Sequence, residues 1–151
     1  MKRFQFRLDK LLRYHQQRQK QADLAVTKAS MDHDAAVSEV RRIKSDIQNA
    51  CRLPERVGQP IEPALREQSL RLANHLSQGL QLAEDKLKAA TQRFREAQNH
   101  RTAVTQEVEA LLHLRTQQLE EHQDEATRQQ QIEIDDVVMK QWSRQRMVRT
   151  G

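Results

Sequence analysis

Apolar residues recur along residues 8–50 at alternating steps of four and three, which is the period of a coiled-coil helix. Polar residues break this stripe at only three positions, and the residues between its positions are rich in Arg, Lys, Gln, Asp and Ser. Neither Gly nor Pro interrupts the pattern, so it predicts one helix over about 6–52. The stripe consists of Leu8, Leu12, His15, Gln19, Ala22, Val26, Ala29, His33, Ala36, Val40, Ile43, Ile47 and Ala50.

A second stripe of the same period follows residues 53–62. Pro54 is expected to end the first helix, because its ring clashes with the preceding turn. Pro63 fits the first position of the next helix, with Glu62 as its N-cap, so the second helix is predicted over about 63–144. Its stripe consists of Ala73, Leu76, Leu80, Ala83, Leu87, Ala90, Phe94, Ala97, Arg101, Val104, Val108 and Leu111.

The point at which the second stripe ends suggests how the two helices pair. If the chain folds back at residues 53–62, Leu8 faces about residue 105 and Met1 about residue 112, which is where the second stripe turns polar. This register also places Gly79 near His33. The sequence therefore predicts an all-α fold, an antiparallel two-helix coiled-coil hairpin whose longer second helix overhangs at the terminal end beyond about residue 112. Residues 1–151 are expected to form a single elongated unit.

Composition favours long helices over a thick core, since aromatic residues are 3% and charged residues 31% of the chain. The sequence has no phosphate-binding glycine loop, no CxxC pair and no HxxxH pair. We therefore expect no catalytic, cofactor-binding or metal-binding residues and no enzyme activity. No apolar run approaches the ~18 residues of a membrane span. A single cysteine and the lack of a signal-peptide pattern favour the cytoplasm.

Charge is distributed unevenly around a net value of +5. Residues 1–28 carry eight basic residues against two acidic ones, and residues 115–136 carry seven acidic residues against two basic ones. These blocks are either solvated helix faces or the surface of a rod that docks into a complementary ring or groove. Apolar residues return near the end, where they either fold back on a neighbour or contact a partner: Ile132, Ile134, Val137, Val138, Met139, Trp142 and Met147.

The opening Phe4-Gln5-Phe6-Arg7-Leu8-Asp9-Lys10-Leu11-Leu12, followed by Ala22, Ala25 and Ala29, resembles the amino-terminal F-x-F-R-L-x-x-L-L pattern of the flagellar export protein FliJ family. Residues 117–136 are similar to the carboxy-terminal segment of that family. The resemblance implies a cytoplasmic part of the flagellar type III export apparatus, similar to the coiled-coil stalk of the F1 ATPase gamma subunit. Its implied partners are a hexameric export ATPase, a membrane protein of the export gate and export chaperones, at the inner membrane. A role in flagellum biogenesis, motility and chemotaxis goes with this assignment.

The resemblance leads to two sets of candidate contact residues. With residues 111–145 as an axial shaft inside the ATPase ring, the candidate ring contacts are Arg7, Lys10, Arg13, Glu121, Glu125 and Arg128. The candidate export-gate contacts, which cluster near the predicted hairpin tip, are Leu65, Leu72 and Leu76.

An alternative function is a self-associating coiled-coil scaffold whose basic ends touch nucleic acid or anionic lipid. The shortage of aromatic residues for base stacking weighs against a nucleic-acid partner. The stalk interpretation predicts a monomer when the protein is free, and the scaffold interpretation predicts an obligate dimer.

Overall fold

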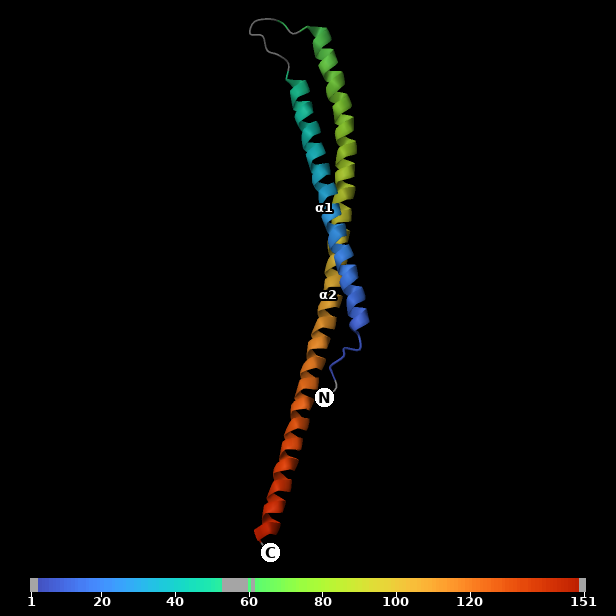
Figure 1. Ribbon diagram of the computed structural model, residues 1–151. Helices are drawn as coiled ribbons and strands as arrows, with labels where there is room; N and C mark the ends of the chain where they lie inside the picture. The colour runs from blue at the N-terminus through green and yellow to red at the C-terminus, as the bar shows by residue number, and fades with distance from the viewer. Residues whose placement is uncertain (1–2, 53–59, 61, 150–151) are drawn as a thin grey trace. The chain divides into compact units, whose positions relative to one another are not determined.

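The computed structural model describes residues 3–52, 60 and 62–149, with side chains up to residue 146. In this part of the chain it consists of two helices and no strand: α1 (Asp9–Cys51) and α2 (Pro63–Arg149) (Figure 1). The fold is therefore an all-α helical hairpin, as the two apolar stripes predicted. α1 begins at Asp9 rather than near residue 6, and α2 continues past residue 144. Pro54, expected to end the first helix, lies outside the described residues.

Local sequence explains where both helices begin. The Asp9 amide donates to the Phe6 carbonyl over 3.2 Å, and the Asp9 carboxylate binds Arg13 one turn later at 2.9 Å. An acidic residue in the first turn is favoured by the helix dipole. At α2, the Glu62 carbonyl accepts hydrogen bonds from the amides of Leu65 and Arg66. This is the behaviour expected of an N-cap residue ahead of a proline in the first helical position.

The backbone contacts divide the chain into two compact units, which we call the central unit (Arg18–Val104) and the terminal unit (Met1–Gln17 with Thr105–Gly151). In the central unit, residues later in α1 contact residues earlier in α2, so the helices are antiparallel. The ion pair of Asp23 with Arg101 spans 2.6 Å and that of Lys44 with Glu84 spans 3.4 Å. Figure 1 shows the blue-to-teal α1 beside the green-to-yellow part of α2 in this unit.

The core of the central unit is one side chain deep and is built from the predicted stripes. Val40, Ile43 and Ala83 are buried against one another, and three partly buried residues pack around them: Ile47, Leu80 and Leu87. Ala22 and Ala90 are also buried. Short alanine side chains at the contact let two helices approach closely, which offsets the small number of large apolar residues.

The expected register between the helices was wrong. His33 stacks on Phe94, with 5.8 Å between the ring centroids, and not on the segment around Gly79, where an added Cβ would meet nothing within 4 Å. The actual neighbour lies about four helical turns further along α2 than the sequence predicted. In consequence, α2 begins well before the point that faces the end of α1, and no helix of the described residues lies beside its first turns.

In the terminal unit, the amino-terminal segment packs on α2. Phe6, Leu12 and Val108 form a buried cluster, and partly buried residues pack against it: Phe4, Leu111 and Leu114. The Phe4 ring meets His122 edge-on with centroids 5.7 Å apart. Coverage of α2 therefore extends beyond the expected limit of about residue 112. Only from residue 127 onward is every described side chain, up to residue 146, exposed.

Candidate partner-binding surfaces

The described residues contain no group of three or more His, Cys, Asp and Glu side chains that could hold a metal ion. Neither described helix has a stretch apolar and long enough to cross a bilayer. The two concavities considered below are open, and neither of them encloses a cavity. The candidate binding sites in the described residues are therefore open surfaces, and three surfaces are distinguished by their charge or by their exposed apolar side chains.

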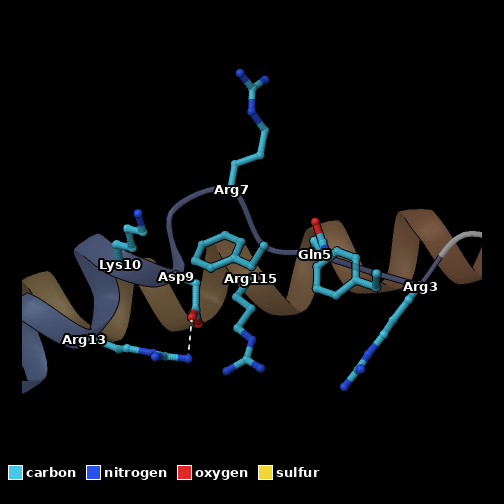
Figure 2. A pocket seen from close by; sticks show the side chains of 9 residues that line it. Arg3, Gln5, Arg7, Asp9, Lys10, Arg13 and Arg115 are labelled. Atoms are coloured by element: carbon cyan, nitrogen blue, oxygen red, sulfur yellow. Dashed lines mark ion pairs between the residues drawn. The ribbon is translucent and has the colours of Figure 1, made fainter.

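The first surface is a basic concavity in the terminal unit, where the amino-terminal segment crosses α2 (Figure 2). Exposed and covered residues alternate along this segment, with Arg3, Gln5 and Arg7 exposed and Phe6 buried. The F-x-F spacing therefore places both aromatic rings on the side that faces α2 and leaves the arginines at the surface. The concavity is lined by Arg3, Phe4, Gln5, Phe6, Arg7, Asp9, Lys10, Arg13 and Arg115.

The charge of this concavity is strongly positive because five cations surround one carboxylate. That carboxylate, on Asp9, is bound to Arg13. Among the described residues, Arg7, Lys10 and Arg115 have no ion-pair partner. Figure 2 shows the side chains of Arg7 and Arg115 extending in opposite directions from the backbone.

The structure brings together three of the six predicted ring-contact residues, Arg7, Lys10 and Arg13, on this one concavity. Glu121, Glu125 and Arg128 are exposed on α2 and do not line it. Sequence reasoning missed Arg3 and Arg115. Arg115 was recognisable in the sequence as the first polar residue on the stripe after Leu111. Its proximity to the amino-terminal segment was not predictable, because it depends on the helix register.

The second surface lies at the start of α2. Leu65 and Leu72 are exposed, and the third predicted export-gate residue, Leu76, is half-buried on the stripe. Leu70 is also exposed. The register explains this exposure, since seven residues of α1 follow Lys44 while twenty-one residues of α2 precede its partner Glu84.

The third surface, which we call the C-terminal apolar surface, occupies a short stretch of α2 in the terminal unit. Six large apolar side chains there are 46–68% exposed: Ile132, Ile134, Val137, Val138, Met139 and Trp142. None of these six folds back on a neighbour, so the structure does not support that interpretation of them. The side chain of Met147 lies outside the described part.

The described residues thus define a helical-hairpin protein with a thin core, charged and apolar surfaces, and no enclosed chemical site. The chain belongs to the flagellar FliJ protein family, because the model of that family matches residues 4–147 of the 151-residue chain. Membership gives the protein a role related to flagellar export, in a family of non-enzymatic export components. Neither the curated proteins nor the solved structures compared with the chain gave a match.

Proposed function

We propose that the protein is a non-enzymatic stalk and adaptor of the flagellar type III export apparatus. In this function the terminal unit enters the ring of the hexameric export ATPase, and the start of α2 contacts the membrane protein of the export gate. Export chaperones are further partners, and the site of action is the cytoplasmic side of the inner membrane. The observation that carries the proposal is the exposure of every described side chain of α2 from residue 127 to residue 146.

A helix exposed on all sides in water gains nothing from tertiary packing and is only marginally stable by itself. A surrounding protein ring would cover such a segment on all faces. The basic concavity lies in the same unit and supplies a charged contact beside the segment. Charges at the rim of an interface mainly steer association and select the partner.

The ring contact can be tested by co-purification of the protein with the export ATPase. A triple variant, Arg7→Glu, Lys10→Glu and Arg13→Glu, replaces three cations of the concavity by carboxylates. We expect it to keep its helical content, since all three side chains are exposed, and to recover much less ATPase. The matched control reverses three exposed cations of the central unit, Lys28, Arg41 and Lys88. Equal recovery of the ATPase by the triple variant and the wild type would refute the contact.

The export-gate contact has a separate test. A double variant, Leu65→Asp and Leu72→Asp, places charges on the exposed start of α2 without disturbing a core. We expect loss of binding to the gate protein and normal binding to the ATPase. Leu82→Asp is the matched control, because Leu82 is also exposed on α2. Normal gate binding by the double variant would assign the contact to another surface.

A further inference from the structure

The C-terminal apolar surface includes a shallow groove along one face of α2. The groove is lined by Gln130, Glu133, Ile134, Val137 and Val138. Positions 130, 134, 137 and 141 follow one another at steps of four, three and four, which is the spacing of a coiled-coil seam. The described residues provide no second helix for this seam.

The order of residues along the seam reads the same way from either end. A glutamine stands at each end, Gln130 and Gln141, and two branched apolar residues, Ile134 and Val137, stand between them. If two copies pair in antiparallel orientation, Ile134 of each copy meets Val137 of the other, and Gln130 meets Gln141. Apolar side chains then meet apolar side chains in the two central layers, and amides meet amides in the two outer layers.

Charges at the edge of the seam fit the same arrangement. Glu133 and Lys140 each directly precede a seam position, so both lie on the same side of the seam. In an antiparallel coiled coil, this side of one helix lies next to the same side of the other helix. The pairing places Glu133 of each copy beside Lys140 of the other, which gives two reciprocal ion pairs. Neither side chain has an ion-pair partner among the described residues, and Asp136, one turn before Lys140, is the nearest competitor on the same helix.

We propose that the groove of Ile134 and Val137, which is one face of the C-terminal apolar surface, is a self-association site, at which residues 130–141 of two copies pair as an antiparallel two-helix coiled coil. The interface covers only about three helical turns and therefore falls below the ~1,200 Å² of a standard stable interface. The dissociation constant of the dimer is accordingly above about 1 µM. The protein is a monomer when dilute and a dimer when concentrated, and any partner that covers this surface competes with the dimer. This inference does not depend on the proposed function.

Sedimentation of the purified full chain over a wide concentration range tests the proposal. A Cys51→Ser background removes the one exposed thiol that could form a disulfide between copies. Glu133→Lys and Lys140→Glu each convert the two reciprocal attractions into two repulsions, so each should raise the dimer dissociation constant roughly tenfold. The double variant exchanges the charges and should restore wild-type association. An equimolar mixture of the two single variants should form heterodimers, since every facing pair is then of opposite charge.

Glu125→Lys and Arg128→Glu are the matched controls, because both residues are exposed on α2 and lie off the seam. They should leave the dissociation constant unchanged, and circular dichroism should show the same helical content for all variants. A wild-type chain that sediments as a monomer throughout would overturn the proposal and leave a different protein as the occupant of this surface. Association that is insensitive to the single variants, or a mixture that forms no heterodimer, would also overturn it.

Discussion

Single residues of the terminal unit differ sharply in how much they stabilise it, and Leu11 and Leu12 show the contrast. Leu12 is 2% exposed and belongs to the cluster with Phe6 and Val108, whereas Leu11 is 42% exposed. Leu12→Ala removes buried methyl groups and leaves a cavity, at an expected cost of about 2–5 kcal/mol. The loss should appear as faster amide hydrogen exchange in residues 9–17 and 105–122. Leu11→Ala should change exchange little, and equal effects of the two variants would contradict the assigned packing.

Glu39 in α1 illustrates a surface charge whose titration is set by its own helix. The Arg42 guanidinium donates to both Glu39 carboxylate oxygens, over 3.0 and 2.6 Å, and this hydrogen bonding lowers the pKa of Glu39. A carboxyl whose pKa is lower in the folded state contributes stability above its unfolded pKa. That contribution is lost as the pH falls through the folded value. The effect is small because both groups are exposed.

The pKa of Glu39 is therefore predicted to return to its ordinary range in an Arg42→Ala variant. An NMR titration of the side-chain carboxyl carbon measures it directly. Arg41→Ala is the control, since Arg41 is a neighbouring cation without a recorded bond to Glu39, and there the pKa should stay low. A titration curve unchanged by Arg42→Ala would show that the pair does not persist in solution.

At the scale of the helices, α2 contains a position that weakens it. Gly79 lies in the helix interior, and an added Cβ would meet nothing within 4 Å. Gly79→Ala should therefore stabilise the central unit by up to about 1 kcal/mol, through the higher helix propensity of alanine. Thermal unfolding followed by circular dichroism should show a higher Tm, while the nearby Gln78→Ala should change it much less. A lower Tm for Gly79→Ala would mean that the glycine has a packing role.

Sequence periodicity predicted which side of each helix is buried against the other helix. It did not predict the register, that is, which residue of α1 lies opposite which residue of α2. Leu12, Ala22, Val40 and Ile43 all belong to the predicted stripe and are all buried. The contact of His33 with Phe94 nevertheless differs from the predicted one by about two heptads. A slip by whole heptads keeps the same stripe turned toward the partner, so apolar spacing alone cannot distinguish one register from another.

The candidate surfaces likewise have features that follow from local sequence and features that depend on the helix register. Arg7, Lys10 and Arg13 are close in sequence, so their proximity followed from local spacing. Arg115 joins them only because the amino-terminal segment crosses α2 at that level, which depends on register. The apolar residues near the end were visible in the sequence, but their exposure was not, because it depends on how far along α2 the amino-terminal segment reaches.

At the scale of the whole molecule, the two hydrophobic clusters and the C-terminal apolar surface occupy different parts of the chain. The clusters involve α1, the amino-terminal segment and α2 as far as Leu114, and the Phe4 contact extends this to His122. Residues 127–146 contribute no buried side chain. Stability and the binding proposed for residues 127–146 should therefore be separable by truncation.

A chain of residues 1–126 keeps every described buried side chain, so we expect its Tm to stay close to that of the full chain. Its helical signal should fall roughly in proportion to the residues removed, and both ATPase recovery and self-association should be lost. A chain of residues 1–111 additionally loses Leu114 and His122, which pack on the amino-terminal segment. It should therefore show faster hydrogen exchange in residues 9–17. Removing residues 112–151 disturbs this packing, whereas removing only residues 127–151 does not. A large drop in the Tm of the chain 1–126 would therefore mean that the exposed segment stabilises the fold.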